Sequence, residues 1–250
     1  MLVLRRWLRI ALAAFALTVM TLPLATAVIF VSLFTSSPRP SYIICRIWAW
    51  GVSKITGVRY SLQGAENALP GMSYVITPNH QSNADILALM RALPTPYRWV
   101  IKKELTKIPL FGLGLLRTGA VSLDRSDPKK SLEKLQSDSG KLKGGWSLLI
   151  YPEGTRSRDG NLQQFKKGAF VLAVSTGIPI LPVTVNGAHK VLPKHSLEIR
   201  PGVISVTIGQ PIPTVGLGEN DIPSLMEKTR QAVAKHFDLN YDPFHADLPK

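Results

Sequence analysis

An uncharged apolar run near the start of the chain most constrains what this sequence can fold into. Residues 10–34 form about 25 consecutive positions without a charged side chain, enough for a helix to cross a ~30 Å hydrocarbon core. The run continues past the cleavage-like Ala25-Thr26-Ala27 to Phe34, which argues against a cleaved signal peptide. We therefore expect a membrane-associated helical region over residues 1–56 and a folded body over residues 57–250.

Pro23 lies near the middle of this run, where its missing N–H and fixed φ predict a break in the helix. The arms on either side, residues 10–22 and 24–34, are each too short to cross the membrane untilted. Arginines flank the run on both sides: Arg5, Arg6, Arg9, Arg39 and Arg46. Because basic flanks prefer the cytoplasmic face, the pattern favours a hydrophobic helical hairpin seated in the membrane, with a kinked single span as the alternative.

The chain is strongly basic, with 30 Lys and Arg against 16 Asp and Glu and a formal net charge of +14. Such a balance predicts partners that carry phosphate, and the apolar N-terminal run favours an anionic membrane surface over nucleic acid. The sequence contains no nucleic-acid-binding motif. Cys45 is the single cysteine, so neither an intrachain disulfide nor a thiolate metal cluster is expected.

After residue 57, short apolar runs alternate with helix-like patterns. Strands are expected at residues 58–62, 73–77, 98–101, 120–123, 146–151 and 180–185, and helices at 86–93, 168–175 and 222–237. Residues 197–200 and 203–208, separated by Pro201-Gly202, resemble a β-hairpin. This alternation predicts an α/β fold with a mixed, largely parallel sheet flanked by helices.

A histidine and an aspartate five positions apart lie in the stretch Asn79-His80-Gln81-Ser82-Asn83-Ala84-Asp85. Such a pair can form a base and its orienting group, because Asp85 can accept a hydrogen bond from one ring nitrogen of His80 and leave the other free to take a proton. Within one ideal helix five residues turn by roughly 140°. The pair therefore meets only if His80 lies in a loop and Asp85 in the first turns of the helix that follows. Alone, His80 would be interpreted as a structural loop histidine.

A second polar stretch, Tyr151-Pro152-Glu153-Gly154-Thr155-Arg156-Ser157, directly follows a strand-like run. Ligands of open α/β sheets gather at the carboxyl ends of strands. Gly154 permits a close backbone approach, Thr155 offers a hydroxyl, and Arg156 offers a planar fork suited to phosphate. Glu153 could orient Arg156 or bind a substrate hydroxyl. An ordinary turn with a surface ion pair is the alternative.

Two further charge pairs follow expected strands, Lys102-Lys103 and Asp124-Arg125. Cations at strand ends can attract an anionic substrate, but such pairs are also common on solvated faces. Residues 178–183 are apolar and predict either a strand that lines an apolar slot or a strand of the core.

Taken in order, these blocks resemble the glycerolipid acyltransferases, and most closely the 1-acylglycerol-3-phosphate O-acyltransferases. The blocks are Asn-His-x4-Asp at residues 79–85, Lys-Lys-Glu-Leu with Ile-Pro-x-Phe-Gly at 102–112, Asp-Arg at 124–125, Pro-Glu-Gly-Thr-Arg-Ser at 152–157 and Ile-Pro-Ile-Leu-Pro-Val at 178–183. The resemblance covers roughly residues 73–185. Tyr151 stands where the family usually has phenylalanine, which keeps an aromatic ring at that position.

The resemblance implies a reaction. His80 would be the general base that deprotonates the free sn-2 hydroxyl of lysophosphatidic acid, and Asp85 would orient and polarise it. The oxygen would attack the thioester of acyl-ACP or acyl-CoA, without a covalent acyl-enzyme, a metal or another cofactor. Arg156, with Lys102 and Arg125, would hold the substrate phosphate. Glu153, Gly154 and Thr155 would shape the same pocket.

Because both kinds of thioester are cytosolic, the resemblance also places the protein at the cytoplasmic face of a membrane, in a bacterium the inner membrane. Alternatives are the same chemistry on glycerol-3-phosphate or a lyso-aminolipid, and a non-catalytic lipid-binding protein on the same scaffold. A His/Asp metal hydrolase would require further ligands, such as a His-Glu-x-x-His sequence, which the chain lacks.

Overall fold

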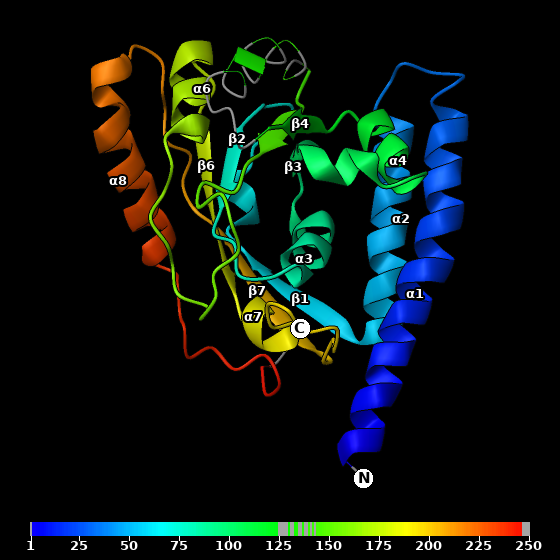
Figure 1. The fold of residues 1–250 in the computed structure, drawn as a ribbon. Coiled ribbons are helices and arrows are strands. Elements are labelled where there is room, and N and C mark those ends of the chain that lie inside the picture. Colours follow the sequence, from blue (N-terminus) through cyan, green and yellow to red (C-terminus); the bar gives the residue numbers. More distant parts are fainter. Residues whose placement is uncertain are drawn as a thin grey trace.

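A seven-stranded sheet forms the centre of the protein, with helices on both of its faces (Figure 1). The computed structural model describes residues 2–124, 130, 133–134, 137, 140, 142 and 144–246. The helices are α1 (Leu2–Val31), α2 (Arg39–Thr56), α3 (Ala84–Ala92), α4 (Phe111–Arg117), α6 (Gly168–Thr176), α7 (Ala188–Val191) and α8 (Ile222–Ala234), with short 3-10 helices η1 (Ala65–Asn67), η2 (Lys103–Lys107) and η4 (Glu219–Asp221). The strands are β1 (Val58–Gln63), β2 (Val75–Pro78), β3 (Tyr97–Lys102), β4 (Val121–Leu123), β5 (Ser147–Leu149), β6 (Ile180–Asn186) and β7 (Gly202–Ile208).

The sheet is mixed and mostly parallel, as the alternation of strands and helices predicted. Its strand order is β1-β7-β6-β2-β5-β3-β4, and every neighbouring pair is parallel except β6 and β7. The hairpin predicted at residues 197–208 is wrong, because residues 197–200 form no strand. Both edges of β7 are already taken, one by β1 and the other by β6, so no place beside it remains for a hairpin partner.

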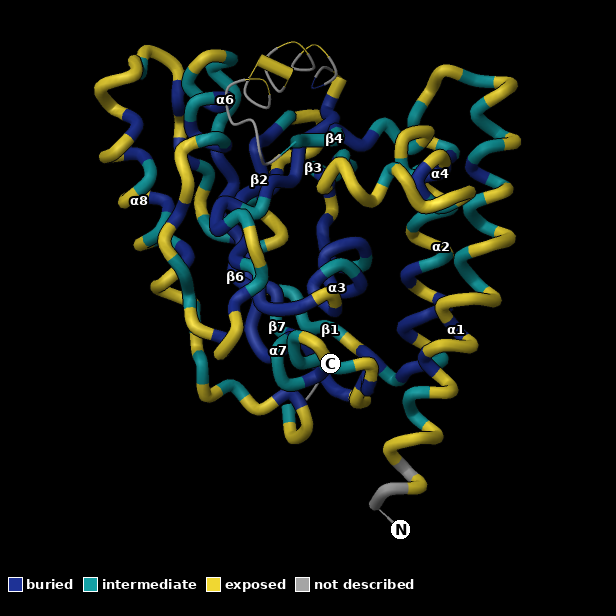
Figure 2. The backbone as a smooth tube through the Cα atoms, viewed as in Figure 1, coloured by how far each residue is buried: buried dark blue, intermediate teal, exposed yellow. Residues whose placement is uncertain are grey.

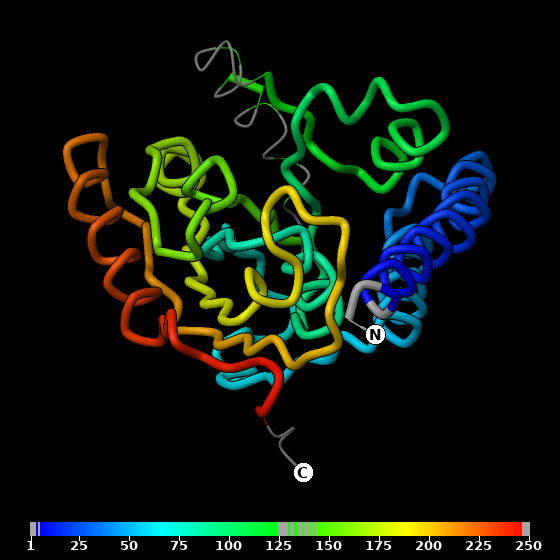
Figure 3. Tube along the Cα trace, turned by 60° about the horizontal axis from the view of Figure 1, so that its bottom comes forward, coloured from blue at the N-terminus to red at the C-terminus, as the bar shows by residue number. Residues whose placement is uncertain are grey.

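Two hydrophobic layers enclose the sheet. Successive strand residues point to opposite faces, so within β2 Val75 packs on the side of α6 and α8, whereas Ile76 packs on the side of α2 and α3. Figures 1 and 3 show α6 and α8 together on one side of the sheet and the pair α1–α2 on the other. All seven residues of β6 are buried, so the apolar block at residues 178–183 belongs largely to the core.

Helices α1 and α2 form a hairpin, but its turn is not where Pro23 predicted it. Helix α1 is continuous from Leu2 to Val31 and includes Pro23, and the chain reverses at residues 32–38. The break predicted at Pro23 is therefore wrong. Pro23 lacks an N–H and so removes one i→i−4 hydrogen bond from the helix. The packing of α1 against α2 and α4 sustains the helix on both sides of it. The indole of Trp48 donates a hydrogen bond to Thr21 Oγ1 at 3.0 Å, which ties the two helices together.

The outer side of α1 is apolar and exposed, in contrast to the dark blue interior of the sheet in Figure 2. By length and composition the segment Arg6–Val31 is able to cross a membrane. Only 11% of its apolar stretch is buried by the rest of the protein. Helix α4 packs beside α1, where Gly114 approaches Ala25, and it adds the exposed Leu113 and Leu116 to the same apolar region. A surface of this kind points to membrane association.

Candidate active site

His80 and Asp85 meet at the carboxyl end of β2, in the geometry that their spacing predicted. His80 lies in the loop before α3 and Asp85 in the first turn of that helix. His80 Nδ1 lies 2.8 Å from Asp85 Oδ2. Because a carboxylate only accepts hydrogen bonds, Nδ1 carries the proton and Nε2 keeps its lone pair. The Asp85 side chain is fully buried, whereas 14% of the His80 side chain is exposed, so the imidazole is accessible and the carboxylate is not.

The loop around this pair is fixed by hydrogen bonds to the backbone. The N–H groups of Gln81 and Ser82 donate to Asp85 Oδ2 at 2.9 and 3.0 Å, so the same oxygen that binds His80 also holds the turn. The Asn79 side chain donates to Val185 O at 2.9 Å and accepts from Val185 N at 2.7 Å, which extends the pairing of β2 with β6 by one residue. This network positions His80 before any substrate binds.

The ring of Tyr151 supports His80 from the side. The two rings are stacked, with centroids 3.6 Å apart and an angle of 13° between their planes. Behind Tyr151 lies Trp99, with a centroid distance of 6.3 Å. Burial, with Asp85 and Glu153 nearby, raises the pKa of the Tyr151 phenol well above its usual value. Tyr151 therefore acts as a neutral aromatic platform that fixes the plane of the imidazole.

Glu153 binds the backbone of the catalytic loop. Its Oε1 accepts the N–H of His80 at 3.0 Å, and its Oε2 accepts from Gln163 Nε2 at 2.9 Å. The N–H of Ser157 in turn donates to the carbonyl of His80 at 2.8 Å. Burial raises the pKa of the Glu153 carboxyl to about 7. Glu153, which was predicted to shape the substrate pocket, thus binds protein donors with both of its oxygens and positions His80.

Between Glu153 and Ser157 the loop presents three residues that were predicted to bind substrate. Gly154 has a φ of +73°, which residues other than glycine rarely adopt, and the end of the Lys166 side chain, from Cδ to Nζ, lies against it. Thr155 is exposed, and the carbonyl of Arg156 accepts a hydrogen bond from Lys194 Nζ at 2.8 Å. No ion pair among the described residues includes the half-buried Arg156 side chain, which leaves its guanidinium available to an anion.

The other two predicted cations are less closely tied to this site. Lys102 ends β3 and pairs with Glu104 at 3.3 Å on an exposed surface. Its neighbour Lys103 pairs with Asp124 at 3.1 Å. Within the described part of the chain, no hydrogen bond or ion pair connects Lys102 with His80. Arg125 lies outside the described residues.

The described residues therefore combine an imidazole, a carboxylate that binds it and, on the adjoining loop, a guanidinium that no described residue pairs. In the part of the chain that the structure describes, no three His, Cys, Asp or Glu side chains gather as they do at a metal site. The chemistry that this arrangement offers is removal of a proton by His80 Nε2, next to a loop that can hold an anion.

A family model described as acyltransferase matches residues 59–186 of the chain. The chain belongs to the acyltransferase family. Its curated relatives include a 1-acyl-sn-glycerol-3-phosphate acyltransferase of Pseudomonas aeruginosa, which is 36% identical over 76% of this chain and 74% of the relative. A chloroplast enzyme of the same description from Arabidopsis thaliana is 35% identical over 84% of this chain and 58% of its own length. The human alpha enzyme is 29% identical over 78% and 69%.

A solved structure has the same fold as this acyltransferase. The crystal structure of the 1-acyl-sn-glycerophosphate acyltransferase PlsC from Thermotoga maritima matches with a TM-score of 0.76 and 25% sequence identity, over 95% of this chain and all of that one. The predicted resemblance to 1-acylglycerol-3-phosphate acyltransferases is thereby confirmed, as is the α/β fold.

Three residues of the candidate site make contacts that the sequence did not reveal. Tyr151 was noted only as an aromatic substitution, yet its ring stacks on His80. Asn79 lies in the stretch of residues 79–85, but its side-chain hydrogen bonds to Val185 form only because β2 lies beside β6. Gln163 carries no local signal, because it acts through Glu153 from ten positions away.

Proposed function

We propose that this acyltransferase moves a fatty acyl group from a thioester, acyl-ACP or acyl-CoA, to the free sn-2 hydroxyl of lysophosphatidic acid and forms phosphatidic acid. The observation that carries the proposal is the His80–Asp85 pair at 2.8 Å, with Nε2 free of the aspartate and partly exposed. The three relatives named above are all 1-acyl-sn-glycerol-3-phosphate acyltransferases, which supports this choice of acceptor.

In the proposed mechanism His80 Nε2 takes the proton of the sn-2 hydroxyl as its oxygen attacks the thioester carbonyl. The tetrahedral intermediate then breaks its C–S bond, and the imidazolium returns the proton to the departing thiolate. Asp85 stabilises the imidazolium through Nδ1, while Tyr151 and Glu153 hold the ring and its backbone in place. No covalent acyl-enzyme is required, because both substrates react directly with each other.

The acceptor phosphate is assigned to Arg156. Arg156 lies on the loop between Glu153 and Ser157, and both of these residues bond to the backbone of His80. A phosphate bound by Arg156 would therefore bring the rest of the acceptor close to the base. Gly154 and Thr155 shape the same loop. Lys102 and Arg125 complete the proposed set, with Lys102 able to exchange its exposed partner Glu104 for the substrate.

We assign the membrane function to residues 1–56 and the chemistry to residues 57–250. The exposed apolar side of α1 and the net charge of +14 fit a protein that binds an anionic lipid surface. Since acyl-ACP and acyl-CoA are cytosolic, we place the body at the cytoplasmic face of a bacterial inner membrane. A reporter fused after Lys250 is expected to be cytoplasmic, and an external reporter would contradict this placement.

The proposal is tested by assaying the purified protein with both thioesters against lysophosphatidic acid, glycerol-3-phosphate and lyso-aminolipids. Lysophosphatidic acid is expected to be the best acceptor. The His80→Ala variant is expected to lose activity by about 10²–10⁴-fold, the usual contribution of a general base. Undiminished transfer by His80→Ala would disprove the mechanism, and a clear preference for another acceptor would disprove the substrate. A lipid-binding protein without catalysis would transfer nothing in any combination.

A further inference from the structure

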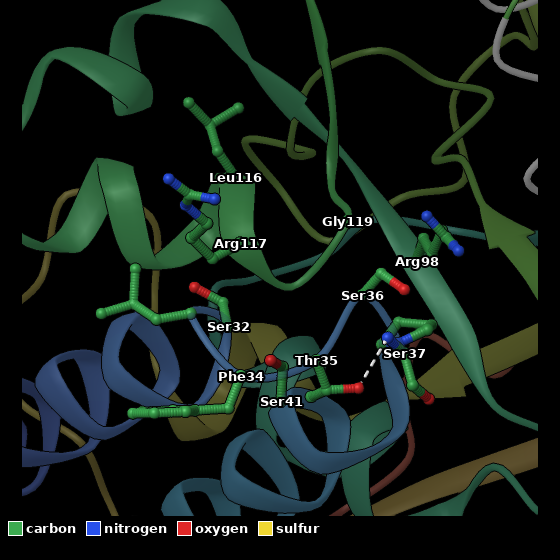
Figure 4. Close-up of a pocket in the computed structure, with 12 residues that line it drawn as sticks. Ser32, Phe34, Thr35, Ser36, Ser37, Ser41, Arg98, Leu116, Arg117 and Gly119 are labelled. Carbon is green, nitrogen blue, oxygen red and sulfur yellow. Dashed lines mark hydrogen bonds between the residues drawn. The ribbon is translucent and has the colours of Figure 1, made fainter.

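A cavity of about 510 Å³ lies at the turn between α1 and α2, beside the end of α4 and the start of β3 and β4 (Figure 4). Its volume is in the range of pockets that bind small molecules. The cavity is separate from the catalytic site. Arg98 is the second residue of β3 and Gly119 comes just before β4, whereas His80 and Glu153 follow the carboxyl ends of β2 and β5. Because β2, β3, β4 and β5 are parallel, the cavity lies at the amino ends of these strands and the catalytic site at their carboxyl ends.

The walls of this cavity are positively charged. Arg98 and Arg117 both line it, and none of the described residues that line it is acidic. The Arg98 guanidinium lies 5.4 Å from the centre of the Trp146 ring, a contact that holds it at the wall. Arg117, at the end of α4, is exposed, and no ion pair among the described residues includes it. The guanidinium of Arg117, which no described carboxylate pairs, favours an anion, and Arg98 adds positive charge to the same wall.

A buried hydroxyl and a helix start face the same space. Ser41 lines the cavity and is only 2% exposed, yet its hydroxyl makes no hydrogen bond with any residue that the structure describes. It lies in the first turn of α2, an 18-residue helix. The residue before that turn, Pro38, provides no side-chain cap, and the turn contains no acidic residue. The partial positive charge of the helix start therefore adds to that of the arginines.

The rim of the cavity is apolar. Leu33, Phe34 and Leu116 line it and are 67%, 75% and 44% exposed. The ring of Phe34 contacts that of Phe30 on α1 at a centroid distance of 5.0 Å, so the rim continues into the exposed apolar side of α1. A ligand that fits both parts has an anionic head and apolar chains.

We propose that this cavity binds the phosphate of an anionic phospholipid headgroup, from a lipid that is not the acyl acceptor, with its chains lying along Phe34 and α1. Arg117 holds the phosphate oxygens, with Arg98 beside it, and the hydroxyl and backbone N–H of Ser41 donate to them. Bound in this way, the lipid fixes the turn of the α1–α2 hairpin at the headgroup level of the bilayer. This inference rests on the membrane association of α1 and not on the proposed reaction.

The test measures thermal unfolding of the full-length protein in a neutral detergent, without any acyl donor. Three probes are titrated: a short-chain phosphatidylglycerol, a short-chain phosphatidylcholine and inorganic phosphate. A ligand that binds the folded state raises the unfolding midpoint as its concentration rises. We expect the anionic lipid to raise the midpoint, and the zwitterionic lipid and free phosphate at the same concentrations to have much less effect.

Arg117→Ala is expected to weaken the response to phosphatidylglycerol by about tenfold or more, the loss that follows from removing one charged hydrogen bond. Ser41→Ala, which removes only the hydroxyl, is expected to weaken it by less. Arg59→Ala removes the same charge from an exposed position on β1 and serves as the matched control. Arg156→Ala tests the catalytic loop. Both of these variants are expected to respond like the unmodified protein.

Three outcomes would overturn the proposal. An equal loss in Arg59→Ala and Arg117→Ala would show a general charge effect. A loss in Arg156→Ala instead of Arg117→Ala would place the lipid at the catalytic loop. An equal response to inorganic phosphate would show a site for free phosphate and not for a lipid. None of these results depends on catalysis, so the proposed function is tested independently.

Discussion

The proposed catalytic loop at residues 79–85 and the α1–α2 hairpin differ in where their side chains find partners. In the loop, polar groups bond to distant parts of the chain, as when Ser82 Oγ donates to the carbonyl of Leu192 at 2.6 Å. In the hairpin, large apolar side chains such as Trp7 and Phe15 remain 64% and 61% exposed. The protein alone therefore determines the geometry of the catalytic loop, whereas the hairpin needs a lipid or detergent environment to cover it.

The largest effect is expected from breaking the catalytic pair with Asp85→Asn. The amide oxygen can still accept the N–H groups of Gln81 and Ser82, so the loop keeps its shape. The amide nitrogen replaces Oδ1, which has no hydrogen-bond partner among the described residues. What is lost is the negative charge that stabilises protonated His80. We expect kcat to fall by about 10²–10⁴-fold with little change in the unfolding midpoint.

Steady-state kinetics and thermal unfolding of the same preparation check this prediction. If kcat remains within a factor of a few of the unmodified protein, Asp85 does not polarise His80. If both kcat and the unfolding midpoint collapse, the aspartate chiefly holds the loop.

The next effect concerns the buried carboxyl that supports His80. In the unfolded chain Glu153 ionises near its ordinary pKa of 4.5, and in the folded protein burial raises this pKa to about 7. Between these pH values the folded protein holds a proton that the unfolded chain has released. The free energy of unfolding should therefore fall as the pH rises from about 5 to about 7, by up to about 3 kcal/mol, and level off above that.

Glu153→Gln should remove this fall. Its amide oxygen can accept the N–H of His80, and Gln163 can turn its own amide to accept from the new NH₂ group. Unfolding measured at pH 5 and pH 8 checks the prediction, with Glu66→Gln, at an exposed position, as the control that keeps the pH dependence. A fall of unchanged size in Glu153→Gln would assign it to other groups.

A smaller effect is expected at the anion-binding end of the loop. Arg156→Ala should raise KM for lysophosphatidic acid by about tenfold to a hundredfold, because a charged hydrogen bond contributes about 1.5–3 kcal/mol. Use of the thioester should change little. The exposed Arg158, two positions further on, provides the matched control Arg158→Ala. An equal rise of KM in both variants would indicate general attraction by positive charge and no specific phosphate site.

The same contrast explains how much of the molecule could be predicted from sequence. His80 and Asp85 were predictable because they are five positions apart and lie where a strand passes into a helix, so local geometry settles their contact. The role of Glu153 was not, because its bond to His80 depends on β5 lying beside β2. The continuity of α1 through Pro23 and the antiparallel pairing of β7 with β6 likewise follow from tertiary packing. Local patterns identified the groups, and strand order determined their partners.

The smallest effect should come from the exposed side of α1. Phe15→Ser is expected to change the free energy of unfolding in detergent by no more than about 0.5 kcal/mol, because the ring contacts little protein. Binding to anionic vesicles should weaken by about tenfold, the worth of moving a large apolar side chain from lipid to water. Phe170→Ser, the same change at a fully buried position, should instead cost about 3–5 kcal/mol of stability. If the two variants were equally destabilised in detergent, the protein would itself cover α1, and the distinction between the two regions would be lost.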